Sequence, residues 1–172
     1  MTKEKLEKFI KESVLDETQF QICHELRGHC ITKHIVDINV LQERVWNMPR
    51  PTVDEPIKVA TRFLSEESAR QLIYETLIEN VKDIANWRSK LYTKDYEITK
   101  EFDIVTGEGI VKGADKNQLI PMHAVRIIIC NGDYFGQPFY IKTAYPFRSF
   151  DDIDACYDAI DEFQARKMKN KK

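Results

Sequence analysis

Residues 124–130, AVRIIIC, and residues 139–146, FYIKTAYP, decide the fold that we expect for this chain. The first segment is almost wholly apolar, which is typical of a strand in the middle of a sheet. Asn131-Gly132-Asp133 follows it and has the composition of a turn. The second segment should therefore return beside the first as its antiparallel partner. Weaker strands are expected at Ile57–Phe63, Tyr96–Ile98, Phe102–Val105 and Gly109–Val111.

Helical periodicity dominates the first half of the chain. Residues 3–14 carry apolar side chains at helical spacing, and Ser65–Ser89 shows the clearest such pattern, with Ser65 as a suitable N-cap. Further helices are expected at about His29–Val36, Val40–Trp46 and 150–168. Helices followed by an antiparallel sheet predict an α+β protein.

Length and composition set the limits of function. The chain has 172 residues, enough for one domain with its own core, and its 42% hydrophobic and 31% charged content is ordinary for a globular protein. A formal net charge of −2 means that any anion-binding surface must be local. No apolar run approaches the ~20 residues that span a bilayer, and the amphipathic N-terminus is not a signal-peptide pattern. Export would need a separate machine or further sequence.

The cysteines favour structural thiols over disulfides or zinc ligands. None of them forms a CxxC pair, and their spacing matches no zinc framework. Cys130 and Cys156 lie in apolar patterns and are expected to be small buried side chains. Cys30, with histidines on both sides, is a weaker alternative as a nucleophile, and Cys23 has no assigned role.

Three of the four histidines lie in residues 23–35, CHELRGHCITKHI, around Gly28. His24, His29 and His34 are five residues apart, which turns neighbouring rings by about 140° on a helix and alternates them on a strand. That geometry disfavours a metal site. His29 or His34 is better suited to proton transfer near neutral pH, with a packing role as the commoner alternative. His123, at the start of a strand, is expected to be structural.

Thr143 and Tyr145 are the second candidate pair. Strict alternation would place them on one strand face with Phe139 and Ile141, with their α-carbons about 6.6–7 Å apart. Two hydroxyl groups at that spacing can converge on one phosphate, although an ordinary sheet edge is the commoner meaning of such a pattern. Arg44 follows His34 by ten residues and is expected to face it, where its guanidinium can clamp a phosphate. Lys33, Arg62 and Lys142 are candidate RNA contacts, with an ordinary solvated charge as the equally common alternative for each.

Several blocks, in order over about residues 23–146, resemble one family. They are His24-Glu25, Gly28-His29-x-Ile31-x-x-His34-Ile35, Leu41-x-x-Arg44-Val45, Ala60-Thr61-Arg62-Phe63, Ile84 with Trp87, and Phe139–Pro146. This order resembles the bacterial ribonuclease A-like toxin domains at the C-termini of contact-dependent growth-inhibition effectors and other polymorphic toxins. Arg27 stands where that family usually has the first of two glycines. The expectation is a single domain over 1–172, with an added C-terminal helix.

The resemblance implies a metal-independent RNA endonuclease with no cofactor. It implies catalytic roles for Arg44, Thr143, Tyr145 and one histidine, His34 or His29. We expect a 2′-hydroxyl to attack the adjacent phosphorus and leave a 2′,3′-cyclic phosphate. The resemblance also implies a cognate immunity protein as partner, export within a larger effector, and growth inhibition from the target-cell cytoplasm. The alternatives are a non-catalytic RNA- or protein-binding domain and, less favoured, a cysteine-dependent hydrolase that uses Cys30 and His34.

Overall fold

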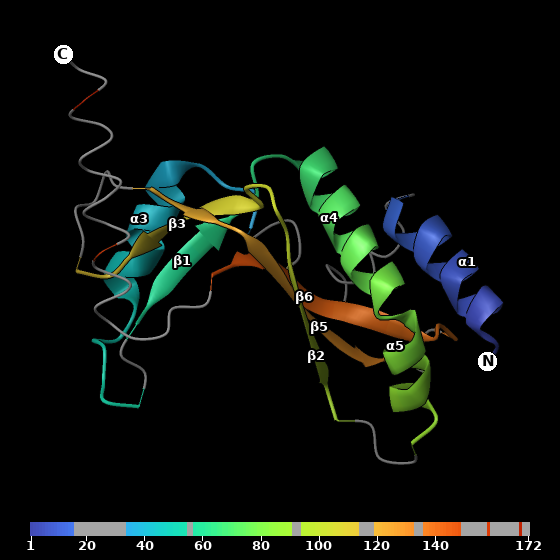
Figure 1. The fold of residues 1–172 in the computed structure, drawn as a ribbon. Coiled ribbons are helices and arrows are strands. Elements are labelled where there is room, and N and C mark those ends of the chain that lie inside the picture. The colour runs from blue at the N-terminus through green and yellow to red at the C-terminus, as the bar shows by residue number, and fades with distance from the viewer. Residues whose placement is uncertain are drawn as a thin grey trace.

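The structure is a computed structural model that describes residues 1–15, 34–54, 57–90, 94–113, 119–132 and 136–148, with Asp158 and Lys169. Its helices precede most of its strands, and every strand pair is antiparallel, which confirms the α+β prediction (Figure 1). The helices are α1 Lys3–Leu15, α3 Ile38–Asn47, α4 Glu66–Glu79 and α5 Val81–Arg88. The strands are β1 Val59–Arg62, β2 Tyr96–Glu101, β3 Gly107–Val111, β4 Ile120–Met122, β5 Ala124–Asn131 and β6 Phe139–Phe147.

The strands form two three-stranded sheets. The paired strands β2 and β5 of one sheet continue into the paired strands β3 and β4 of the other, and together these four strands make one long two-stranded ribbon. The first sheet has the order β1-β3-β4 and the second sheet the order β2-β5-β6. The pairing continues from one sheet to the next, because Phe102 N donates to His123 O at 2.7 Å and Thr106 N donates to Met122 O at 2.8 Å. Residues 103–105 therefore loop out opposite His123, and the strand predicted at Phe102–Val105 is wrong. β1 and β6 add to opposite edges of this ribbon.

Helices cover one face of the second sheet. α1, α4 and α5 pack their apolar sides onto this face and form the main core (Figure 1). From the sheet, the core receives Ile98, Val125, Ile127, Ile129, Phe139, Ile141 and Ala144. α3 instead packs Leu41 and Val45 against Ala60 and Ile110 of the first sheet. The opposite face of the second sheet is not covered by α1, α4 or α5.

The helix predicted over Ser65–Ser89 is two helices. Ser65 is the N-cap as predicted, since its Oγ accepts from Ser68 N at 3.1 Å. The break falls at Asn80, whose φ of −100° and ψ of 12° leave the helical range and whose Nδ2 donates to Thr76 O at 2.8 Å. Asparagine side chains that bond nearby backbone compete with helix continuation, which gives the break a physical cause. Both helices contribute buried residues to the same core.

A β-bulge in β6 changes the predicted faces of that strand. Ile128 pairs with Thr143 and Ile129 with Ile141, so Lys142 is an extra residue with no partner on β5. Beyond the bulge the alternation is reversed, and Ala144 joins Phe139 and Ile141 in the core. Thr143 and Tyr145 therefore share a face with each other but not with Phe139 and Ile141. The prediction of one common face for all four was wrong.

Some predictions lie outside the described residues. The predicted helix at His29–Val36 lies outside them as far as residue 33, and the predicted helix at 150–168 lies outside them apart from Asp158. The same holds for the side chains of His24, His29, Cys23, Cys30, Cys156 and Lys33. Cys130 is a buried free thiol, as predicted. In the described part of the chain, no helix has both the length and the apolar character needed to cross a bilayer.

Candidate active site

His34 contacts one strand of each sheet, β1 of the first and β6 of the second. Its Nδ1 lies 3.1 Å from the carbonyl oxygen of Thr61 in β1, and Phe63 N donates to the His34 carbonyl at 2.6 Å. Its ring stacks on the ring of Tyr145 in β6, with centroids 5.4 Å apart and an angle of 29° between the planes. The structure therefore brings together His34 and Tyr145, which the sequence predicted as partners.

The contact with Thr61 selects the tautomer of the His34 ring. A carbonyl oxygen only accepts hydrogen bonds, so Nδ1 must carry the proton that lies between the two atoms. In the neutral ring Nε2 then holds the basic lone pair. A ring fixed in this way is suited to proton transfer through Nε2.

Thr143 and Tyr145 lie on the face of the second sheet that points away from the helical core. The register places Thr143 opposite Ile128 and Tyr145 opposite Arg126 on β5. Thr143 is nearly buried, whereas Tyr145 is half-buried. The bulge at Lys142 puts both hydroxyl-bearing side chains on this face, where Tyr145 contacts His34.

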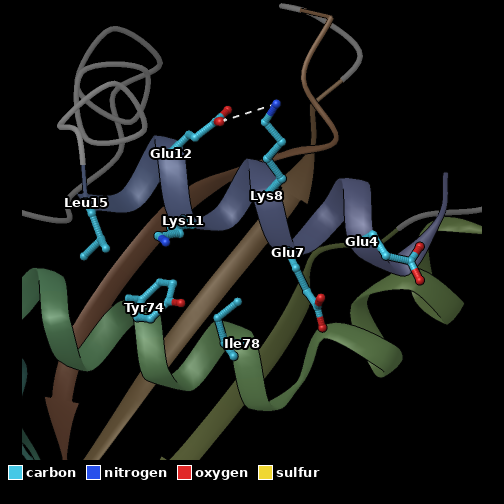
Figure 2. A pocket seen from close by; sticks show the side chains of 8 residues that line it. All are labelled: Glu4, Glu7, Lys8, Lys11, Glu12, Leu15, Tyr74 and Ile78. Carbon is cyan, nitrogen blue, oxygen red and sulfur yellow. Dashed lines mark ion pairs between the residues drawn. The ribbon is translucent and has the colours of Figure 1, made fainter.

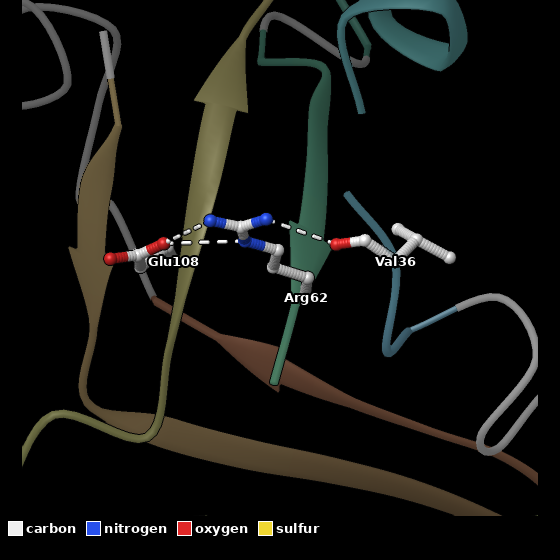
Figure 3. Close-up of polar contacts among 3 residues, drawn as sticks. All are labelled: Val36, Arg62 and Glu108. Carbon is white, nitrogen blue, oxygen red and sulfur yellow. Dashed lines mark hydrogen bonds and ion pairs between the residues drawn. The ribbon is translucent and has the colours of Figure 1, made fainter. Parts of the chain in front are cut away.

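Arg62 has a different setting from the one predicted for an RNA contact. Its Nε and NH2 donate to Glu108 Oε2 at 3.3 and 3.0 Å, and its NH1 donates to Val36 O at 3.0 Å (Figure 3). Glu108 lies directly opposite Arg62 in the β1–β3 pairing. The guanidinium thus ties β1 and β3 of the first sheet to the segment that follows His34.

Arg44 lies in the last turn of α3 and is half-buried. Because α3 packs on the first sheet, Arg44 comes from a different layer than Thr143 and Tyr145. Lys112 fixes the end of this helix, since its Nζ donates to Val45 O at 3.1 Å and Trp46 O at 2.9 Å and also contacts Met48 O. That Arg44 faces His34 stays a prediction.

Lys142 is exposed at the bulge and pairs with Asp95. Its Nζ lies 2.6 Å from Asp95 Oδ2, and Cys130 Sγ donates to Asp95 Oδ1 at 3.0 Å. The hydrogen bond from Lys142 lowers the pKa of Asp95 and raises that of Lys142 itself. Burial, followed by the contact with Asp95, raises the pKa of Cys130 to about 11. Lys142 is thus a fixed cation beside Thr143.

A groove between α1 and α4 lies on the helical side of the second sheet (Figure 2). Its volume is about 680 Å³, and Leu15 of α1 with Tyr74 and Ile78 of α4 form its apolar part. The charged lining residues belong to α1 and have both signs: Glu4, Glu7, Lys8, Lys11 and Glu12. Since His34 and Tyr145 meet on the other face of the sheet, this groove is separate from the candidate site.

Helices packed on two antiparallel sheets, with a histidine that contacts one strand of each sheet, make up an α+β protein with a candidate site between the sheets. The family model described as Bacterial CdiA-CT RNAse A domain matches residues 28–146. The match covers more than half of the chain, so the chain belongs to this family and is a ribonuclease A-like toxin domain.

A solved structure has the same fold. It is described as a crystal structure of a CdiA-CT/CdiI complex from Y. kristensenii, with a TM-score of 0.59 and 22% sequence identity. The similarity covers 70% of this chain and 100% of the other. The comparison with curated proteins gives no match.

Sequence reasoning missed the residues that hold His34 in place. Thr61 acts through its main-chain carbonyl, which no side-chain pattern reveals. Glu108 lies in β3, and no sequence pattern indicated its role as the partner of Arg62. The Ala60-Thr61-Arg62-Phe63 block was the available signal, because it marks the strand against which His34 packs.

Proposed function

We propose that this toxin domain is a metal-independent endoribonuclease that cuts RNA by transesterification. The observation that carries the proposal is the fixed ring of His34, held between the Thr61 carbonyl and the Tyr145 ring. Membership in the CdiA-CT ribonuclease A family supports the same reaction class.

In this mechanism Nε2 of His34 takes the proton from a ribose 2′-hydroxyl. The 2′-oxygen attacks the adjacent phosphorus, the bond from phosphorus to the 5′-oxygen breaks, and a 2′,3′-cyclic phosphate is left. In the net reaction the proton moves from the 2′-oxygen to the departing 5′-oxygen. His29, outside the described residues, is the alternative residue for this role.

Three further residues stabilise the charge that develops on the phosphorane. Arg44 holds the non-bridging oxygens, for which a guanidinium supplies two parallel donors. Thr143 and Tyr145 donate hydrogen bonds to the same phosphate, and Tyr145 also orients the ribose and base. Lys33 and Lys142 contribute positive charge along the RNA. Arg62 is assigned a positioning role instead, because its three hydrogen bonds go to Glu108 and Val36.

The biological setting follows from the family. A free ribonuclease harms the cell that makes it, so we propose that a cognate immunity protein binds this domain, as CdiI is bound in the Y. kristensenii complex. An acidic immunity protein would complement the positive charges that Arg44 and Lys142 contribute to the proposed site. The domain is exported within a larger effector and acts in the cytoplasm of a target bacterium, where RNA cleavage stops growth.

The deciding experiment is incubation of the purified domain with RNA in the presence of EDTA, followed by mapping of the new ends. We expect fragments with 2′,3′-cyclic phosphate ends, and no cleavage of DNA or of RNA with a 2′-deoxy sugar at the cut site. Cleavage restored only by magnesium would overturn the metal-free mechanism. A gel shift without cleavage would instead support the alternative, a non-catalytic RNA-binding domain.

A further inference from the structure

Arg126 stands beside Tyr145 on the face of the second sheet that carries the candidate site. The two residues are directly opposite each other in the β5–β6 pairing. Directly opposed residues in an antiparallel pair have β-carbons about 4.5–5.5 Å apart and project from the same face. An arginine at this position therefore extends from the immediate neighbourhood of the Tyr145 ring.

The Arg126 side chain is held in one orientation. Its Nε lies 3.2 Å from Glu97 Oε1 and 3.4 Å from Thr99 Oγ1, both on β2. Its guanidinium carbon lies 3.8 Å from the centre of the Phe147 ring. Stacking on an aromatic face and a bonded Nε fix the plane of the guanidinium without using its two terminal nitrogens.

The terminal nitrogens are suited to an anion. Among the residues that the structure describes, the polar contacts of Arg126 all use Nε. NH1 and NH2 form the pair of parallel donors that matches two oxygens of a phosphate. The Arg126 side chain is 27% exposed and that of Glu97 is 54% exposed. An ion pair with so exposed a carboxylate contributes little to stability, so folding alone does not account for the arrangement.

We propose that Arg126, stacked on Phe147, forms a second phosphate subsite, which binds the RNA phosphodiester next to the one that is cut. This inference rests on the proposed ribonuclease activity and extends it to a second nucleotide position. Glu97 acts as a tether that orients the guanidinium and also competes with the RNA phosphate for it. Arg126 therefore contributes to substrate binding and not to the chemical step.

Substrates of different length test the subsite directly. A dinucleotide with one phosphodiester cannot fill the subsite, whereas trinucleotides extended on either side carry a second phosphodiester. For the wild type we expect at least one trinucleotide to have a KM about tenfold lower than the dinucleotide, a typical effect of a charged hydrogen bond. Arg126→Gln should remove this advantage, so that the dinucleotide and the trinucleotide have nearly the same KM. Equal losses on both substrates would place Arg126 on the scissile phosphate and overturn the proposal.

Variants of the tether separate binding from folding. Glu97→Gln removes the competing charge, so it should bind a non-cleavable 2′-deoxy oligonucleotide severalfold more tightly than the wild type. Arg126→Lys keeps the charge but not the paired donors, so its affinity should be intermediate. Lys8→Gln, in the exposed Lys8–Glu12 pair on α1, is the matched control and should bind as the wild type does.

Salt dependence gives a second readout that needs no cleavage. Arg126→Gln loses one phosphate contact. For binding to a single strand, its slope of log affinity against log salt should therefore be about 0.7 less steep than that of the wild type. Unchanged affinity and slope in a folded Arg126→Gln protein, or no gain in Glu97→Gln, would overturn the subsite. Because binding is measured on a non-cleavable strand, this failure is distinct from failure of the proposed function, in which the wild type would not cut RNA.

Discussion

Nδ1 of His34 lies 3.1 Å from the carbonyl oxygen of Thr61, 27 residues further along the chain. This bond fixes both the position of the ring and its tautomer, and an amide side chain can imitate the position of either ring nitrogen without its basicity. Asparagine at position 34 can keep a donor near the Nδ1 position, and glutamine can place an amide near the Nε2 position. Neither amide accepts a proton at neutral pH.

For catalysis at His34 we therefore expect His34→Asn and His34→Gln to lose activity alike. Loss of a general base typically costs about 10²–10⁴-fold in kcat. The measurement is cleavage of a defined RNA under single-turnover conditions, with His29→Ala as the parallel variant. Activity within a few-fold of wild type in every His34 variant, with a large loss in His29→Ala, would move the proton-transfer role to His29.

Arg62 and Glu108 are expected to act through His34 and not on RNA. Arg62→Gln removes the hydrogen bond to Val36 O and the ion pair with Glu108, so the segment after His34 loses its support. We expect kcat to fall with KM nearly unchanged, with partial rescue in Arg62→Lys and a smaller loss in Glu108→Gln. The opposite split, a raised KM at constant kcat, would show that Arg62 binds RNA as the sequence predicted.

The sequence predicted the main strands because their signals are local. The apolar run at Ala124–Cys130 and the turn after it are read within a few residues, and β5 and β6 pair as expected. The bulge at Lys142 depends on the register between two strands, which no short segment encodes. For that reason the sequence predicted the Thr143–Tyr145 pair but placed it on the wrong face of β6.

The candidate site shows the same division between local and distant information. His34, Thr143 and Tyr145 could be proposed from residue type and family blocks. The Thr61 carbonyl could not, because a backbone acceptor leaves no trace in the sequence. The break at Asn80 also escaped prediction, since the apolar periodicity continues through it from α4 into α5.

The pair of Asp95 and Lys142 predicts a pH dependence at the bulge. The pKa of Asp95 is lowered in the folded protein, so near that pKa the unfolded chain binds more protons than the folded one. The stabilisation is thus present above the ordinary aspartate pKa of about 3.9 and is lost as pH falls through the lower folded value. Urea unfolding of wild type and Asp95→Asn should differ at pH 6, and the difference should shrink as the pH falls below the ordinary aspartate pKa. A difference that grows on acidification would contradict this sign.

Cys130 is expected to resist alkylation in the folded protein. It is 6% exposed, and its pKa of about 11 leaves about one thiolate in a thousand at pH 8. Peptide mapping after iodoacetamide treatment should find Cys130 unmodified in the native protein and modified after denaturation. RNA cleavage that survives the alkylation of accessible cysteines would also remove the cysteine-dependent alternative that uses Cys30. Loss of cleavage together with modification of Cys30 would support it.

Gly107 lies where β1, β3 and β6 approach one another. Substitution there should push these strands apart. A β-carbon at Gly107 would lie 2.3 Å from Arg62 O and 2.3 Å from Pro146 Cγ, neither of which can turn aside. We expect Gly107→Ala to lower the free energy of unfolding by about 1–3 kcal/mol, the usual cost of overpacking. It should also reduce cleavage, because Thr61 and Tyr145 would move apart around His34.

Gly109→Ala is the matched control on the same strand. Its β-carbon would meet the end of the flexible Met122 side chain at 2.6 Å and Val59 Cγ1 at 3.0 Å, whereas its nearest backbone contact, Ala60 O, is 3.1 Å away. The methionine side chain can rotate, so the loss in stability should be smaller and cleavage nearly unchanged. Chemical unfolding and cleavage rates measured on both variants decide the point. Equal losses in the two variants would mean that the close approach at Gly107 does not hold the two halves of the site together.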